Sequence, residues 1–491
     1  MPLSVTNTLT GDTEEFTADE DVLLYVCGLT VSDDPHLGHA RLWVHADIVH
    51  RWLDHLGYDV RHVENVTDVN EKITARAGER AEWSGEADVA ETFTAEVFDA
   101  MRGLNLERAE VYPRVSEHVP EIIDLIETLV ESGHAYEADG SVYFDVTSYD
   151  EYGKLSNQEL EELEAQGEPS ERAEKRHPSD FALWKAGGVS EDAVREHAKH
   201  DHEDTLPEGQ TWDSPWGEGR PGWHIECSAM STTHLGDTLD IHMGGRDLVF
   251  PHHENEIAQS EAATGEQFSR YWLHCGLLSM KGEKMSSSIG NFWTVPDALE
   301  ELGVNVIRTF YAGAAYRSEQ ALTDETITEA EQRWERLSRT YDSAVEAVDS
   351  VDAHTKVEDH ELRGAVEDTR EDFTAAMNDD FNVREAMTAI LDLTDAVNRH
   401  LDERTEYDYS GLRRAVDTFE ELGGDVLGLQ FTTPTAGEAE LAEELVELVL
   451  DVREAEREAG NYERADELRD ALEEVGVEVQ DSPEGPTFRL S

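Results

Sequence analysis

The chain has little lysine, little cysteine and no long apolar run. Its 491 residues include only eight lysines and three cysteines. Because Cys27, Cys227 and Cys275 are far apart in the sequence, the disulfide framework of a small secreted protein is excluded. No apolar stretch approaches the roughly 20 residues that span a bilayer, and the N-terminus has no signal-peptide pattern. We therefore expect a cytoplasmic protein with no membrane partner.

Positive charge is scarce throughout the chain. Lysine and arginine together number 39 against 110 acidic residues, which gives a net charge of −71. Such an excess is typical of disordered chains, but here the acidic residues are spread between periodic apolar positions. A folded protein with a solvated acidic surface fits this pattern better, because in molar salt the Debye length falls to ~3 Å and self-repulsion is screened. The composition thus predicts a halophilic protein, although a nucleic-acid partner would normally call for a basic surface.

The most informative stretch is Asp21 to Tyr58. An apolar run at 22–26 predicts a buried parallel strand, and apolar residues at helical spacing follow up to Leu56. The expected helix begins near His36-Leu37-Gly38-His39, where free backbone N–H groups and the helix dipole favour a phosphate. The motif is weak evidence by itself, because histidines near a helix start are usually surface or capping residues.

Strands and helices alternate over the first two thirds of the chain. This order predicts an α/β fold: a doubly wound, Rossmann-like catalytic domain over 1–321, with ligands at the carboxyl edge of its sheet and an insertion at about 110–220. Acidic amphipathic helices predict a helical bundle over 322–430. A linker rich in threonine and proline then leads to a small α+β C-terminal domain over 439–491.

One polar segment of the insertion, Val189–Glu208, contains His197, His200 and His202 beside many acidic residues. A metal-binding tract is one interpretation of such a segment. A solvated surface segment fits the composition better.

A second short motif makes the first one much stronger evidence. Lys284-Met285-Ser286-Ser287-Ser288, together with the histidines at 36 and 39, resembles the KMSKS and HIGH signatures of class I aminoacyl-tRNA synthetases. Longer stretches are similar to one family of that class, the cysteinyl-tRNA synthetases: YVCGLTVSDDPHLGH, NVTDVNEKI, RPGWHIECSAM and IHMGGRDLVFPHHENEIAQS. The resemblance extends from about residue 8 to the C-terminus.

The resemblance implies a reaction and its partners. A monomer would join L-cysteine to tRNA(Cys) through a cysteinyl-adenylate, using ATP with Mg²⁺, while the bundle and the C-terminal domain would contact the tRNA stem and anticodon. Two other interpretations remain open. One is a cysteine ligase of the mycothiol type, which acts on an amino sugar, and the other is a non-catalytic tRNA-binding paralogue.

The resemblance also implies roles for individual residues. His36, His39 and Lys284 would be catalytic, because they would stabilise charge on the phosphates of ATP. The expected ATP-binding residues are His36, Gly38, His39, Gly244, Gly245, Lys284 and Ser287, and the expected cysteine-binding residues are Gly28, Thr30, Trp223, His242 and Asp247. Ser287 departs from the family, whose loop has a second lysine at this position, so one cation is missing.

Two cysteines, a histidine and a glutamate form the candidate metal site. His252 and Glu256 are four residues apart and can share one helix face, and thiolates with imidazole suit Zn²⁺. From the residues alone, core packing explains Cys27 and Cys227 better than metal binding does, because separated cysteines usually pack in the core. The resemblance implies that these four hold one Zn²⁺ per chain and that the substrate thiolate joins the ion. Serine would then be rejected, which a hydrophobic pocket does poorly. We expect Cys275 to be structural, and His253 and Glu254 to point away from the metal.

Overall fold

The computed structural model describes most of the chain. The described residues are 2–160, 173–200, 206–280, 283–284, 293–431, 446, 449–450, 452–453, 456–457, 461–474, 477–482 and 485–490. For 283–284, 478–482, 485–490 and a few positions within 463–474 only the backbone is described. The chain forms two compact units, Met1–Gln430 and Phe431–Ser491.

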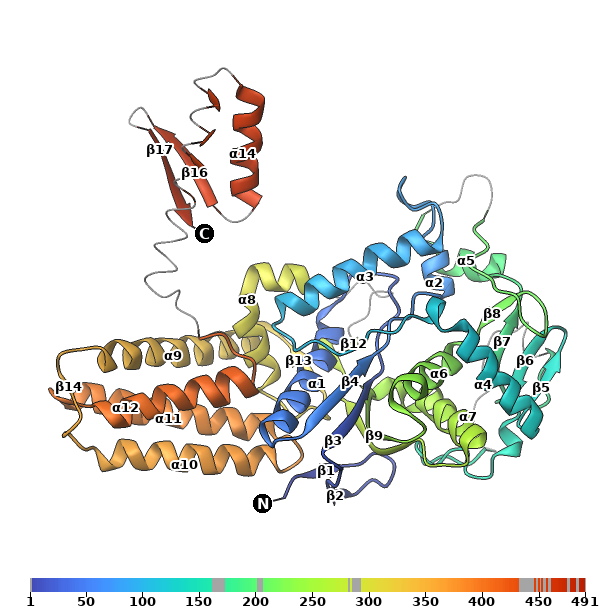
Figure 1. Cartoon of the computed structure of the whole chain (residues 1–491), viewed down its shortest axis with the longest axis horizontal. Coiled ribbons are helices and arrows are strands. Elements are labelled where there is room, and N and C mark those ends of the chain that lie inside the picture. Colours follow the sequence, from blue (N-terminus) through green and yellow to red (C-terminus); the bar gives the residue numbers. More distant parts are fainter. Residues whose placement is uncertain are drawn as a thin grey trace. The chain divides into compact units, whose positions relative to one another are not determined.

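A parallel four-stranded sheet forms the centre of the first unit. Its strand order is β10 (Ser269–Cys275), β9 (Leu239–Gly245), β3 (Asp21–Val26) and β4 (Asp59–Glu64). Helix α1 (Leu37–His55) lies on one side of these strands, with α6 (Trp223–Leu235) and α7 (Glu254–Thr264) on the other (Figure 1). The central strand β3 is buried on both faces, as its run of apolar residues predicts. The doubly wound fold expected from the sequence is confirmed.

An antiparallel sheet is inserted between β4 and β9. Its order is β5 (Ala135–Ala138), β6 (Ser141–Phe144), β7 (Phe181–Ala186) and β8 (Gly219–Pro221), and it follows α2 (Glu71–Thr74), α3 (Glu86–Gly103) and α4 (Val119–Ser132). The β5–β6 hairpin turns at Asp139-Gly140, where both residues have positive φ. Strand β7 was not predicted, because it lies within a stretch that is polar on average. Its Leu183 and Trp184 are nevertheless fully buried.

The expectation of a fully solvated segment at 189–208 is wrong in part. Ser190 caps the short helix α5 (Glu191–His197), whose Ala193 and Val194 are buried against Ala75 beside α2. Lys199 then forms an ion pair with Asp33, with an N–O distance of 2.5 Å. His202 lies outside the described residues. The segment therefore docks on α2 through one apolar face and exposes its acidic face.

A small sheet and a helix follow the central sheet. Strand β11 (Leu278–Met280) pairs in parallel with β13 (Gln320–Leu322) and antiparallel with β12 (Glu283–Lys284). Helix α8 (Val295–Tyr311) lies between β12 and β13 in the chain and packs against α1.

Four long helices make the bundle expected after residue 322. They are α9 (Asp324–Val348), α10 (His360–Met377), α11 (Val383–Glu403) and α12 (Tyr409–Thr418), and a π-helical turn, Phe419–Val426, ends the bundle. Their apolar faces meet in a core that includes Leu337, Phe373, Leu393 and Phe419.

The second unit contains helix α14 (Tyr462–Glu474) and the antiparallel strands β16 (Val477–Ser482) and β17 (Gly485–Leu490), as predicted. Most of 439–459, the first part of the predicted C-terminal domain, lies outside the described residues. Among the described residues, no helix is long and apolar enough to span a membrane.

Candidate active site and metal centre

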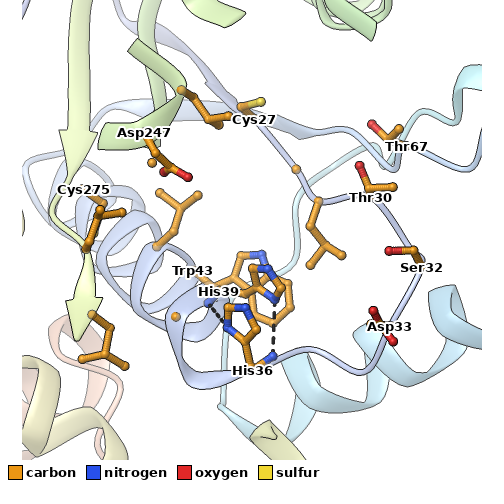
Figure 2. Close-up of a pocket in the computed structure, with 18 of the residues that line it drawn as sticks. Cys27, Thr30, Ser32, Asp33, His36, His39, Trp43, Thr67, Asp247 and Cys275 are labelled. Carbon is orange, nitrogen blue, oxygen red and sulfur yellow. Dashed lines mark hydrogen bonds between the residues drawn. The ribbon is translucent and has the colours of Figure 1, made fainter. Parts of the chain in front are cut away.

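A cavity of about 350 Å³ opens at the carboxyl ends of β3, β9 and β10. It lies where ligands bind in doubly wound folds. The residues around it include Cys27 and Thr30 after β3, the histidines at the start of α1, and Asp247 after β9 (Figure 2). Trp43, Lys72 and Asp33 also line it, and none of these three was predicted. Lys72 could have been suspected, because lysine is rare in this chain.

The two signature histidines cap α1 together. The His36 imidazole accepts a hydrogen bond from the His39 backbone N–H, and His39 Nδ1 accepts one from the His36 backbone N–H (Figure 2). Their rings stack with centroids 3.7 Å apart. A Cβ on Gly38 would lie 2.8 Å from the His36 ring, so a larger residue at 38 would displace this imidazole. The arrangement holds both rings at the cavity edge, beside the positive end of the helix.

Gly28 is required by a close backbone approach. A Cβ there would lie 1.7 Å from the Asn65 carbonyl oxygen. Asn65 also accepts hydrogen bonds through Oδ1 from the Gly28 backbone N–H and from the Tyr25 hydroxyl, at 2.8 and 2.9 Å. Its Oδ1 is 3.7 Å from the Cys227 sulfur. Asn65 thus ties β4 to the end of β3, a role that the sequence pattern did not reveal.

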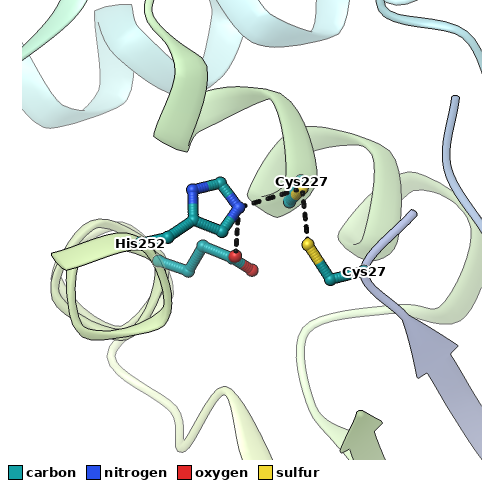
Figure 3. Close-up of side chains that lie close together, drawn as sticks. Cys27, Cys227 and His252 are labelled. Atoms are coloured by element: carbon teal, nitrogen blue, oxygen red, sulfur yellow. Dashed lines mark hydrogen bonds and ion pairs between the residues drawn. The ribbon is translucent and has the colours of Figure 1, made fainter. Parts of the chain in front are cut away.

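The four candidate metal ligands converge at one end of the cavity, where Cys27 and Cys227 line it and His252 and Glu256 lie behind them. Cys27 follows β3, Cys227 lies on α6, and His252 and Glu256 come from the turn before α7 and from α7 itself. The two sulfurs are 3.9 Å apart, and His252 Nε2 lies 3.5 Å from the Cys227 sulfur and 3.0 Å from Glu256 Oε1 (Figure 3). All four side chains are buried, and their ligand atoms lie within 4.8 Å of one another.

These distances fit a tetrahedral Zn²⁺ site. With usual zinc–ligand bond lengths, the sulfur–sulfur and sulfur–nitrogen edges of such a tetrahedron are about 3.8 and 3.5 Å. A second feature also favours a cation: Glu256 Oε1 is buried, and the atom 3.0 Å from it is His252 Nε2, itself a candidate ligand. The donor set of two sulfurs, one nitrogen and one oxygen is the kind that zinc prefers.

Without a metal, the two cysteines of the cluster favour their protonated forms. A hydrogen bond with Cys227 lowers the pKa of Cys27, but burial and the Glu256 carboxylate together raise it above its ordinary value. A hydrogen bond with Cys27 and burial raise the pKa of Cys227 well above its ordinary value. Burial disfavours charge on both His252 and Glu256. The Glu256 carboxylate and the Cys227 sulfur outweigh burial at His252 and raise its pKa to about 10. His242 and then His252 outweigh burial at Glu256 and lower its pKa to about 2. Metal binding would therefore displace protons from the two thiols and from His252, whereas Glu256 is already ionised.

Histidines around the cluster hold the ligands in place. His242 Nε2 lies 2.9 Å from Glu256 Oε2, and His224 Nδ1 lies 2.9 Å from His252 Nδ1. Neighbours of this kind orient metal ligands in many proteins. His224 was missed by sequence reasoning, although it lies in the stretch WHIEC that carries Cys227.

His253 and Glu254 differ in where they lie. His253 Nε2 is 3.9 Å from Glu256 Oε1, so His253 borders the cluster, contrary to expectation. Glu254 points away as expected, and its carboxylate accepts hydrogen bonds from backbone N–H groups of Gly153 and Ser156.

Some of the predicted substrate-binding residues line the cavity, others lie behind its wall, and others lie outside the described residues. Gly28, Thr30, Trp223, Gly245 and Asp247 line the cavity, with Trp223 stacked on the His252 ring at 4.3 Å between centroids.

Two predicted residues lie behind the cavity wall. His242 is fully buried behind Glu256, and the Cα of Gly244 faces the His253 ring. Cys275, which we expected to be structural, does line the cavity. The Lys284 side chain and Ser287 lie outside the described residues.

Comparison with known proteins gives the family. The family model "tRNA synthetases class I (C) catalytic domain" matches residues 13–332, and the DALR domain model matches residues 372–432. The chain is 65% identical to cysteine–tRNA ligase of Haloarcula marismortui and 60% identical to that of Halobacterium salinarum, both halophiles, over the full length of each protein. It is 43% identical to cysteine–tRNA ligase of Thermococcus onnurineus over all of this chain and 99% of the relative.

A solved structure shows the same fold at low identity. Mycobacterium tuberculosis methionyl-tRNA synthetase in complex with methionyl-adenylate is 16% identical and superposes with a TM-score of 0.59. The match covers 83% of this chain and 92% of that one. From the full-length identities and the matched catalytic domain, the chain belongs to the cysteine–tRNA ligase family of class I aminoacyl-tRNA synthetases.

Proposed function

We propose that this chain joins L-cysteine to tRNA(Cys) with ATP, in the cytoplasm, and that the cavity lined by residues of α1 and α6 is its active site. The observation that carries the proposal is the four-residue cluster Cys27, Cys227, His252 and Glu256 at one end of the cavity that the histidines of α1 also line. One half of the cavity offers groups for a triphosphate, and the other half offers soft ligands for a thiol.

Cysteine activation depends on how the two substrates are positioned and not on a protein nucleophile. The substrate carboxylate attacks the α-phosphate of ATP, which forms cysteinyl-adenylate and releases pyrophosphate. We assign His36 and His39 to the phosphates, because their rings are fixed at the helix N-terminus. Lys284, which follows β11 in the chain, would neutralise the leaving phosphates, and Mg²⁺ would accompany ATP. A ribose hydroxyl of the terminal tRNA adenosine, the 2′-OH in class I enzymes, then takes the cysteinyl group.

The amino acid would lie over the metal cluster. Asp247 lines the cavity and would hold the substrate ammonium group, and Trp223 would cover the side chain. Cys27, Cys227, His252 and Glu256 would hold Zn²⁺, which when bound supplies a soft acceptor for a thiolate. We propose that His242 acts by orienting Glu256, since its Nε2 lies 2.9 Å from Oε2.

We also propose a separate role for each of the three parts of the chain. We assign catalysis to 1–321, contacts with the tRNA stem to the bundle at 322–430, and anticodon recognition to 439–491, in a monomer. The DALR match within the bundle and the full-length relatives support a tRNA substrate over an amino sugar.

Two assays test this function together. Exchange of pyrophosphate into ATP should require cysteine and should not occur with serine. Charging of cognate tRNA in molar KCl should follow. Exchange without charging would indicate a ligase for another acceptor, and absence of both would indicate a non-catalytic paralogue.

A further inference from the structure

Arg41 is a buried arginine with an unusual set of partners. Its side chain is almost fully buried, at 1% exposure, one helical turn after His36. Nε donates to the Gly276 carbonyl at 2.9 Å, Nη2 donates to the Ser318 carbonyl at 2.6 Å, and Nη1 donates to the Gln320 side chain. Two longer hydrogen bonds reach the carbonyls of residues 315 and 316. In the described part of the chain, the oxygens that accept these hydrogen bonds are all neutral, and the Cys275 side chain also lies within hydrogen-bonding reach of the guanidinium.

Such an arrangement is not explained by ion pairing. A buried charge is costly unless its donors are satisfied, and most buried arginines are paired with a carboxylate. Arg308, equally buried, follows that rule: it pairs with Asp47 and also donates to three backbone carbonyls. Arg41 instead donates to backbone carbonyls of two segments, at Gly276 and at 315–318, and to the side-chain amide of Gln320. A planar fork of this kind fixes geometry better than a lysine could.

One of the two segments that Arg41 contacts, which begins at Gly276, leads to the predicted loop that contains Lys284. Gly276 and Leu278 line the cavity, and β11 begins at Leu278. Gln320 is the first residue of β13, which pairs with β11, and β11 in turn pairs with β12 at Lys284.

The other end of that loop is also tied to α1. The Leu37 N–H donates to the Trp293 carbonyl at 3.0 Å, and His36 forms a bridge with Thr294. Both described ends of the loop are therefore anchored on the first two turns of one helix.

We infer that Arg41 is a positioning residue for the activation step. It sets the small sheet that carries Lys284 at a fixed distance from the turn of α1 that carries His36 and His39. This inference rests on the proposed function, because it assigns importance to that distance. Misplacement of reacting groups by about 1 Å can cost about 10²-fold in rate.

The test compares two variants with a matched control. Arg41→Lys keeps the charge but cannot reach Gly276, Ser318 and Gln320 together, and Gln320→Met removes one acceptor without changing α1. Both should lower kcat of cysteine-dependent pyrophosphate exchange, by about 10²-fold for Arg41→Lys and less for Gln320→Met. The KM for cysteine and the zinc content per chain should remain those of the wild type. Arg308→Lys should lower Tm yet leave kcat per folded molecule unchanged.

The outcomes separate this inference from the proposed function. Wild-type kinetics in both Arg41→Lys and Gln320→Met, measured per folded molecule, would overturn the positioning role. If Arg41→Lys does not fold, Gln320→Met decides alone. Absence of exchange in the wild type would overturn the proposed function, and the Arg41 inference with it.

Discussion

The sulfur atoms of Cys27 and Cys227 lie 3.9 Å apart, although 200 residues separate them in the chain. The fold brings them together because Cys27 directly follows β3, and α6 places Cys227 beside this end of the strand (Figure 3). Neither residue forms a disulfide, and His252 completes a triangle with them. Substitutions in this pair therefore test how the cavity recognises its substrate.

Replacing Cys27 by serine should weaken the metal site. A hydroxyl is a poor zinc ligand, so zinc content should fall, and the KM for cysteine should rise while the KM for ATP changes little. Cys275→Ser provides the control, since Cys275 lines the cavity outside the four-residue cluster and its loss should leave zinc content intact. Full zinc occupancy in Cys27→Ser would contradict the ligand assignment.

Low salt should unfold the protein. The net charge of −71 repels itself strongly when screening is lost. We expect helical circular dichroism and activity to disappear together on dialysis from ~3 M to ~0.1 M KCl. A spectrum that stays constant over this range would refute the adaptation to high salt.

Lys284→Ala should slow adenylate formation by roughly 10²–10³-fold, the usual effect of losing one preorganised electrostatic partner. Ser287→Lys, which restores the cation that the family has at this position, should be neutral or faster. Single-turnover formation of cysteinyl-adenylate measures both. Near-normal rates in Lys284→Ala would mean that the loop has another role.

Glu64 should make the fold less stable as pH rises. Its carboxyl accepts a hydrogen bond from Trp43 Nε1 at 2.8 Å, but burial dominates and raises the pKa of Glu64 to about 8. An unfolded glutamate titrates near ~4.3, so between that pH and about 8 the folded chain keeps a proton that the unfolded chain has released. The free energy of unfolding therefore falls with rising pH in this window.

Glu64→Gln isolates this contribution. Thermal unfolding in molar salt should show the wild type losing Tm relative to the variant from about pH 5 to about pH 8. Asp59→Asn, at the exposed start of the same strand, is the control and should follow the wild type. Parallel profiles for wild type and Glu64→Gln would show that Glu64 is ionised in the folded chain.

Much of the site could be predicted because its signals are local. The apolar run before Cys27, the helical spacing after His36 and the four-residue interval between His252 and Glu256 each reflect the geometry of a single element. The resemblance to the synthetase family then predicted that these elements meet at one site.

The parts that were missed depend on contacts between distant segments. Whether His242 faces the cavity or Glu256 depends on how β9 packs against α7, and no periodicity encodes that. Strand β7 was hidden because its apolar core is short and its flanks are polar. Likewise, the burial of Val194 against Ala75 follows from tertiary packing, which outweighs an acidic composition.

Cobalt substitution tests the central claim most directly, namely that the metal selects cysteine. With Co²⁺ in place of Zn²⁺, the visible spectrum of the protein should reflect the two thiolates and the imidazole of the cluster. We predict that adding cysteine shifts this spectrum, because a further thiolate joins the ion, and that adding serine at the same concentration does not. A spectrum that is indifferent to cysteine, in a protein that still activates it, would contradict the account and reduce the metal to a structural role.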